Sequence, residues 1–459
     1  MPDIAERPGP LYQAIVDAMA EDIRRGRLAA GAKLPPHRDL AWRLKVTVGT
    51  VARAYAEAER VGLVTGQVGR GTFVSQRAAP ASLADYMAVH PLDEAGVVDM
   101  TKNRPTADNI ALVAETLRAV TERPDFAALL GYRLGDELPR HRAAAAAWLA
   151  EEGVPVPPER AIVTVGGQQA MVAVLASTTR PGEAILCEQL TYPGIKTAAS
   201  LLDRRLIGLP TDEHGLIPEA YEAALTSREA RLLYIMPTVN NPTGVLMPAE
   251  RRQAIVEIAR RHDGLIVEDG VHAYLCEPPA PTPIAALAPE RGYYLTALSK
   301  IVAPALRVGF VAVPEGQGAR VMGAVSAMTT MLPQLMAEAA AMLIESGAVR
   351  RCAAANRIEA AARHAVVASL LGPEVAGPLP TFLCFLKLPA AWRASEFVTE
   401  AWRRGVAVSP AAAFVVGGRP VEAVRMNLSA PRDLAELERG LKVIAELVAA
   451  VPETCCLTV

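Results

Sequence analysis

Five short motifs carry side chains that could do chemistry, and each of them follows a short apolar run. In chain order they are Gly166-Gly167-Gln168-Gln169-Ala170, Tyr192-Pro193-Gly194, Asn240-Asn241-Pro242-Thr243-Gly244, Glu268-Asp269, and Ser299-Lys300 with Arg307 seven residues later. Small residues at the start of a helix expose backbone amides, and the helix dipole favours a phosphate there. The asparagine-proline motif is a turn by its own composition and could be no more than a loop. Taken singly, none of the motifs decides a function.

The apolar runs before these motifs predict the elements that position them. They are 162–165, 184–187, 232–236, 265–267, 293–295 and 308–311. Short, fully apolar strands separated by helical patterns are typical of a sheet that is buried on both faces, and they predict an α/β architecture. In such sheets ligands bind beyond the carboxyl ends of the strands, which is where the motifs fall.

The first 75 residues follow a different pattern, which predicts a winged helix-turn-helix. Apolar residues recur at every fourth position from Leu11 to Ile23 and mark one face of a helix. A short second helix is expected over 39–44, and a third begins at about Thr47, whose hydroxyl can cap it. A hairpin over 62–74 completes the unit.

The motifs of this segment resemble the DNA-binding head of GntR-type bacterial regulators. They are Leu34-Pro35-Pro36-His37-Arg38-Asp39-Leu40-Ala41, Thr50-Val51 with Ala54-Tyr55, and Gly69-Arg70-Gly71-Thr72-Phe73-Val74. The resemblance implies that six residues contact double-stranded DNA: Arg38, Thr47, Thr50, Arg53, Arg70 and Gly71. Arg38 and the wing tip would contact the phosphate backbone, while the third helix enters the major groove.

One departure from the GntR pattern concerns the third helix. The family usually has an arginine where this chain has Val48, which removes a candidate for reading guanine and leaves the operator sequence open. The alternative interpretation is a degenerate winged helix that is kept only for packing.

The order and spacing of the five later motifs resemble the fold-type-I aminotransferases, the aspartate aminotransferase superfamily, over residues 100–445. The resemblance implies pyridoxal 5′-phosphate as cofactor and a large mixed-sheet domain followed by a small α/β domain. It also implies that eight residues bind the cofactor: Gly167, Gln168, Tyr192, Asn241, Asp269, Ser299, Lys300 and Arg307.

Each of these residues has a role by resemblance. Lys300 would form the Schiff base, and Asp269 would keep the ring nitrogen protonated. Asn241 would donate to the phenolic oxygen, Tyr192 would stack on the ring, and the others would hold the phosphate. Arg425, in Val424-Arg425-Met426-Asn427-Leu428-Ser429, would grip the α-carboxylate of an amino acid. Its alternative interpretation is an ordinary surface arginine.

Two departures weaken the expectation of efficient transamination. The family often has a tyrosine two or three residues after the strand-end aspartate, where this chain has Val271 and His272. Ala297 stands where a phosphate-binding serine is common. His272 could replace the tyrosine, although a lone histidine is more often structural or exposed.

The order of the two modules is that of MocR-type regulators, a subgroup of the GntR family. We expect a winged helix-turn-helix over 1–75, a linker over 76–96, and an aminotransferase-like domain over 97–459, with its large part at 97–325 and its small part at 326–459. The resemblance implies a homodimeric transcriptional regulator that senses an amino acid or amine through an aldimine at Lys300. The alternatives are a working aminotransferase that uses an amino acid and a 2-oxo acid, and a cofactor-storage or scaffolding protein.

Composition narrows the class of protein. The chain has 459 residues, of which 51% are hydrophobic and 21% charged, with a net charge of −2, and this excludes an intrinsically disordered chain. Residues 1–76 hold 11 Lys/Arg against 8 Asp/Glu, whereas the remainder holds 36 against 41, so one basic end fits a nucleic-acid partner.

Targeting signals and metal motifs are not evident in the sequence. No run approaches 18 apolar residues and the start lacks a signal pattern, so we expect a cytoplasmic protein without a membrane partner. The six scattered cysteines do not form a pair at zinc-ligand spacing, and we expect no metal.

Overall fold

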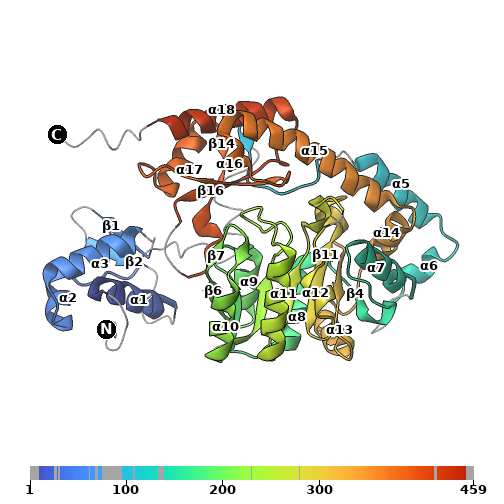
Figure 1. Cartoon of the computed structure of the whole chain (residues 1–459), viewed down its shortest axis with the longest axis horizontal. Coiled ribbons are helices and arrows are strands. Elements are labelled where there is room, and N and C mark those ends of the chain that lie inside the picture. Colours follow the sequence, from blue (N-terminus) through green and yellow to red (C-terminus); the bar gives the residue numbers. More distant parts are fainter. Residues whose placement is uncertain are drawn as a thin grey trace. The chain divides into compact units, whose positions relative to one another are not determined.

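A computed structural model describes most of the chain, as two compact units that we treat separately (Figure 1). The units span 1–89 and 90–459. The described residues are 10–24, 28, 31–60, 63–67, 71–74, 96–106, 109–132, 139–228, 230–278, 280–417 and 421–450. Arg70 and the linker predicted over 76–96, except Gly96, lie outside them.

The first unit, the head, has the predicted winged helix-turn-helix. Its elements are α1 (Leu11–Arg24), α2 (His37–Leu44), α3 (Val48–Arg60), β1 (Val64–Gln67) and β2 (Gly71–Val74). The two strands pair antiparallel, with Val64 opposite Val74. Ile15, Val51 and Ala58 are fully buried, so the apolar stripes of α1 and α3 form the core of the head.

The second unit, the body, is built on a seven-stranded mixed sheet. Its strands are β4 (Ala161–Thr164), β5 (Ala184–Glu188), β6 (Arg205–Leu209), β9 (Ala230–Ile235), β10 (Leu265–Asp269), β11 (Gly292–Ala297) and β12 (Gly309–Ala312). The strand order is β4-β12-β11-β10-β9-β5-β6. The strands from β11 to β6 are parallel, and β12 runs antiparallel to β11 and β4. The predicted α/β sheet is confirmed, with β6 as an additional edge strand whose first residue, Arg205, is exposed.

Side-chain alternation along the strands divides the sheet between two cores. In β9, Leu232 and Tyr234 enter one core, while Leu233 and Ile235 enter the other. Helices α7 (Pro139–Glu151), α8 (Gly166–Thr178) and α13 (Gly318–Thr329) lie on the first side. Helices α10 (Pro218–Thr226), α11 (Ala249–Arg261) and α12 (Ile284–Leu287) lie on the second. Burial on both faces explains why these strands are apolar throughout.

A smaller sheet follows toward the carboxyl end. Strands β13 (Leu383–Lys387), β16 (Ala423–Asn427) and β15 (Ser409–Pro410) form it in that order and pair antiparallel. Near it, β3 (Val98–Asp99) pairs parallel with β14 (Val406–Ala407), so the first described residues of the body lie beside its C-terminal elements (Figure 1). The division predicted near residue 325 stays a prediction.

The remaining elements connect these layers. The helices are α5 (Ile110–Thr121), α6 (Phe126–Leu129), α9 (Pro193–Leu201), α14 (Gln334–Glu345), α15 (Ala348–Leu371), α16 (Pro373–Ala376), α17 (Ala394–Arg403) and α18 (Leu434–Ala449). The short strands β7 (Thr211–Asp212) and β8 (Gly215–Leu216) form a hairpin. Single 3-10 turns span 158–160, 273–275, 298–300, 304–306 and 411–413. Among the described residues, every helix is too short or too polar to cross a membrane.

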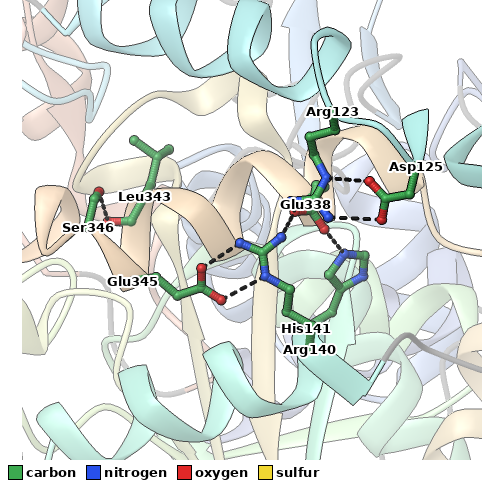
Figure 2. A network of polar contacts seen from close by, with 8 residues as sticks. All are labelled: Arg123, Asp125, Arg140, His141, Glu338, Leu343, Glu345 and Ser346. Atoms are coloured by element: carbon green, nitrogen blue, oxygen red, sulfur yellow. Dashed lines mark hydrogen bonds and ion pairs between the residues drawn. The ribbon is translucent and has the colours of Figure 1, made fainter.

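A buried carboxylate joins three helical segments on the first side of the sheet. Figure 2 shows Glu338 of α14 facing Arg123, which follows α5, and Arg140 and His141 of α7. Glu338 is 1% exposed, and its carboxylate lies 3.0 Å from the Arg123 guanidinium and 2.9 Å from His141 Nε2. Glu345 pairs with Arg140 at the partly exposed edge of the same network. Glu338 of α14 therefore compensates the positive charges that Arg123 and Arg140 bring to it from two other segments.

Glu338→Gln is expected to lower the free energy of unfolding of the body by about 2 kcal/mol. That value lies between those of exposed and fully buried ion pairs, because the two arginines keep part of their hydration. Glu345→Gln is the matched control, since its side chain is 45% exposed, and it should cost less than about 1 kcal/mol. Chemical denaturation followed by tryptophan fluorescence measures both, because buried Trp148 lies in α7. Equal losses in the two variants would contradict the proposed importance of Glu338.

Candidate cofactor and DNA sites

The sheet brings the predicted cofactor residues to one edge. Asp269 ends β10, Asn241 follows β9, and Lys300 lies in the 3-10 turn directly after β11. These three strands are parallel neighbours, so their carboxyl ends meet at the same edge. The start of α8, which carries Gly167 and Gln168, belongs to the same region through Arg307, described below.

Asp269 is buried and held by two donors. Tyr234 Oη donates to its Oδ2 at 2.6 Å, and the Val271 backbone amide donates to its Oδ1 at 3.1 Å. Burial raises the pKa of the Asp269 carboxyl, while the two hydrogen bonds act in the opposite direction. Tyr234 was missed in the sequence because it lies within an apolar run. The signal available was its hydroxyl, since a buried tyrosine oxygen usually requires a partner.

Lys300 is half-buried, and its amine lies in a positively charged environment. Its Nζ donates to the backbone oxygen of Asn103 at 2.7 Å. Burial, then the charges of Arg425 and Arg307, lowers the pKa of Lys300 to about 8. About a tenth of the amine is therefore uncharged at pH 7, a far larger fraction than at the ordinary lysine pKa, and the uncharged amine is the form that attacks an aldehyde.

His272 lies within the site and is neutral. It is 3% exposed, and burial followed by the charges of Lys300 and Arg425 lowers its pKa to about 3. Asn103 Nδ2 lies 3.2 Å from His272 Nε2. Because the amide nitrogen can only donate, the facing nitrogen of the neutral ring accepts. His272 is thus a buried site residue rather than an exposed one, and Asn103 is a neighbour that the sequence did not reveal.

The start of α8 forms a cradle with Arg307. Gly166 has a φ of +78°, a conformation that favours glycine, and a Cβ built on it would lie 2.7 Å from Arg307 Nη2 and displace that guanidinium. Gln168 Nε2 donates to the Gly194 backbone oxygen at 3.0 Å, and Tyr192 Oη lies 3.4 Å from Gln168 Oε1. These contacts place Tyr192, which is half-buried, beside the helix start.

Arg425 is buried in β16 rather than exposed, so its interpretation as a surface arginine is wrong. It is 3% exposed and donates through Nη2 to the Thr101 backbone oxygen and, at 2.9 Å, to Ser409 Oγ. Its guanidinium carbon lies 5.1 Å from the centre of the Phe414 ring. Arg425 and Lys300 donate to backbone oxygens only two residues apart, Thr101 and Asn103, which places both cations at the same segment.

The residues at this edge fit pyridoxal phosphate. Ser299 Oγ and Asn241 Oδ1 are buried polar atoms without a hydrogen-bond partner in the described part of the chain. The glycine cradle, Arg307 and the start of α8 form a donor set suited to a phosphate. Glycine at 167 leaves space beside Val271 and Ala297, where an added Cβ would lie 3.4 Å and 3.8 Å from their side chains. Among the described residues, no group of three or more His, Cys, Asp or Glu side chains could hold a metal ion.

The head presents most of its predicted DNA-contacting residues on its surface. Arg38, Thr47, Arg53 and Gly71 are exposed, and Thr50 is half-buried. Thr47 caps α3, because its Oγ1 accepts from the Thr50 amide at 3.1 Å. The Arg53 guanidinium carbon lies 4.1 Å from the centre of the Tyr12 ring. Roles in DNA contact stay predictions for all six residues.

Tyr55 holds α3 against the segment before α2. Its hydroxyl donates to the Pro35 backbone oxygen at 2.8 Å, and its ring centre lies 4.9 Å from that of His37. Burial raises the pKa of Tyr55 to about 12. The hydroxyl therefore stays a donor at neutral pH, and this contact supports the orientation of α3 relative to α2.

Comparison with known proteins defines the class of this chain. Residues 95–444 match the aminotransferase class I and II family, and residues 11–74 match the gntR family of bacterial regulatory proteins. The HTH-type transcriptional regulator YdeF of Bacillus subtilis is 30% identical over 449 residues, covering 97% of this chain and 96% of that protein. The HTH-type pyridoxine biosynthesis transcriptional regulator PdxR of Corynebacterium glutamicum is 28% identical over 384 residues, covering 80% of each.

A solved structure shows the same body fold. The multiple substrate aminotransferase from Thermococcus profundus superposes with a TM-score of 0.71 at 23% identity, covering 78% of this chain and 92% of that one. Head and body together define a GntR-type regulator with an aminotransferase class I and II body. The chain belongs to the MocR-type group of that family, as the resemblance predicted.

The pH dependence of cofactor uptake tests the environment of Lys300. Only the uncharged amine reacts, so the rate of pyridoxal phosphate uptake should rise about tenfold per pH unit below the Lys300 pKa and level off above it. We expect this change of slope, which we call the break in the pH profile, near pH 8. Absorbance stopped-flow measures the rate.

Two variants distinguish the cause of that break. Arg425→Met removes a positive charge that lowers the Lys300 pKa, so the break should move to higher pH. Arg350→Met removes a charge whose side chain is 70% exposed, and the break should stay in place. An unchanged break in Arg425→Met would show that Arg425 does not influence the amine.

Proposed function

We propose that the chain is a transcriptional regulator whose head binds double-stranded DNA and whose body senses an amino acid or amine through Lys300 and pyridoxal phosphate. When bound, that cofactor supplies an aldehyde that condenses with amines and a ring that withdraws electrons. Lys300 would hold the cofactor covalently, Asp269 would face its ring nitrogen, and Asn241 would donate to its phenolic oxygen. Gly167, Gln168, Ser299 and Arg307 would bind its phosphate, and Tyr192 would stack on the ring.

One observation carries the sensing part of the proposal: a single backbone segment contacts both groups that an amino acid would engage. The segment 99–104, which we name the strap, accepts from Arg425 at Thr101 and from Lys300 at Asn103. A carboxylate on Arg425 competes with the first carbonyl, and covalent use of the Lys300 amine removes the donor to the second. Both contacts of the strap therefore depend on what occupies the site.

The strap is anchored to the C-terminal strands and lies close to the linker in sequence. The Met100 amide donates to the Ala407 backbone oxygen at 2.9 Å, and the Asn427 amide donates to the Met100 oxygen at 2.7 Å. The Arg104 amide donates to Ser429 Oγ at 3.2 Å. The predicted linker ends immediately before β3. A displacement of the strap could therefore act on the head through the linker, so that DNA binding would depend on which molecule occupies the site. This is a two-state hypothesis in which a ligand shifts the population of the strap.

The regulator is proposed to be a cytoplasmic homodimer. Three large apolar side chains near the start of the body, Ile110, Leu130 and Tyr132, are 77%, 60% and 84% exposed. Large exposed apolar groups favour a surface that is covered in an assembly.

A second candidate function, an aminotransferase, is favoured by the retention of Lys300, Asp269, Asn241 and Arg425 at one site. These residues would serve an enzyme as well as a sensor. Alanine at 297 and histidine at 272 weigh against efficient turnover, because they remove a phosphate-binding hydroxyl and a phenol.

Lys300→Ala separates sensing from simple DNA binding. The full chain with pyridoxal phosphate should show the visible absorbance of a lysine-bound cofactor, and amino acids should change its affinity for its operator; the variant should lose both. In the same samples, hydrogen exchange of the strap amides should change with amino acid in the parent chain only, because its two contacts with Arg425 and Lys300 depend on what occupies the site, while β9 amides serve as the internal control. Unchanged ligand-dependent operator binding in Lys300→Ala would refute covalent sensing. Steady amino-group transfer to a 2-oxo acid, with operator affinity unaffected by amino acids, would favour the enzyme.

The oligomeric state is tested by light scattering on the full chain. We expect twice the mass of one chain at micromolar concentration, and a shift toward single chains in Tyr132→Asp, which places a charge on an exposed apolar position. Ser227→Asp, at the exposed end of α10, is the matched control. A single-chain mass for the parent would contradict the dimer.

A further inference from the structure

The packing of α3 leaves a defined face of the helix on the surface of the head. Val51 and Ala54 are fully buried in the head core and Tyr55 is 4% exposed. Val48, the first residue of α3, stands three residues before Val51 and seven before Tyr55, so it lies at the edge of this core stripe, and Ala52 lies one position beyond Val51. Val48 is 46% exposed, and Ala52 is exposed as well. The exposed surface of the first turns of α3 therefore carries two aliphatic side chains, Val48 and Ala52, beside exposed Arg53.

The polar side chains of the same turns make contacts within the head. Thr47 Oγ1 accepts from the Thr50 amide at 3.1 Å and lies 2.8 Å from Thr50 Oγ1. The Arg53 guanidinium carbon lies 4.1 Å from the centre of the Tyr12 ring. Gly49 adds no side chain, and a Cβ built on it would meet only Thr47 Oγ1, at 3.8 Å. The polar side chains nearest to Val48 thus already have partners within the head. Because Gly49 has no side chain, a DNA base could approach Val48 closely on that side.

We infer that Val48 is a specificity-determining residue that reads a base pair by contact with the C5-methyl group of thymine. The inference rests on the proposed function, since it needs α3 in the major groove. There, guanine offers acceptors that need donors, whereas thymine offers a methyl group that an aliphatic side chain can cover. Val48 cannot donate a hydrogen bond, and its exposed isopropyl group loses water when it packs on a methyl group.

The test begins with the operator. Selection from a random duplex library with the full chain should return sites with a recurring thymine at one position of each half-site. Deoxyuridine then replaces each thymine in turn, which removes only the methyl group. At the position read by Val48 this should weaken binding about fourfold, the effect of about one buried methyl group, whereas thymines elsewhere should tolerate uracil.

Variants at residue 48 assign the effect to that side chain. Val48→Ala should bind the thymine site about fourfold more weakly and be indifferent to uracil at that position. Alanine is a better helix former than valine, so the variant keeps α3. Val48→Ile is the matched control, because it keeps the aliphatic contact and should stay sensitive to uracil. Val48→Arg should select guanine in place of thymine.

The outcomes separate this inference from the proposed function. If the full chain binds no duplex DNA selectively, the proposed regulator fails and the inference with it. If the chain binds a defined operator but tolerates uracil at every position, or if Val48→Ala loses as much affinity on uracil substitution as the parent, DNA binding stands and methyl readout by Val48 is overturned.

Discussion

The proposed chemistry of the body depends on positive charge around a half-buried lysine, Lys300. Burial and the guanidinium groups of Arg425 and Arg307 lower the pKa of Lys300 to about 8, and the same surroundings keep His272 neutral. The contact of the Lys300 amine is a backbone carbonyl rather than a carboxylate. A carboxylate at that distance would favour the charged amine and raise its pKa. Neutral acceptors therefore hold the amine without suppressing its reactivity.

Burial also shifts the pKa values of carboxyl groups in the body. Glu188 of β5 and Glu268 of β10, the two strands that flank β9, are fully buried, and burial raises their pKa values to about 8 and about 7. All three carboxyls accept hydrogen bonds that favour the charged form: Glu188 from the Met236 amide, Glu268 from the Ala285 amide, and Asp269 from Tyr234 and the Val271 amide. What distinguishes Asp269 is its place as the last residue of β10, at the edge of the sheet where Lys300 follows β11.

Head and body use opposite strategies for recognition. The body gathers cationic groups around a small site, in which guanidinium groups can bind a carboxylate or a phosphate. The head offers arginines at its surface together with the exposed aliphatic side chains of Val48 and Ala52 at the start of α3. Phosphate contacts position a protein on DNA without reading sequence, whereas contacts to base edges specify it. In the proposed regulator, Val48 would contribute to the choice of operator sequence. The strap would make DNA binding depend on whether Lys300 is free or holds the cofactor.

The sequence by itself predicted the architecture and the candidate residues at the strand ends, but not their neighbours Tyr234 and Asn103. Apolar runs, the order of five strand-end motifs and the helical spacing of the head were enough to predict both modules, because local pattern reflects burial on one face or two. Tertiary structure decided what residues distant in sequence do to each other. In the folded chain Arg425 is buried and Tyr234 donates to Asp269. Asn103 contacts both Lys300, through its backbone oxygen, and His272, through its side-chain amide. These contacts join positions up to 324 residues apart. No periodicity encodes such pairs, because they arise only when strand ends meet at a shared edge.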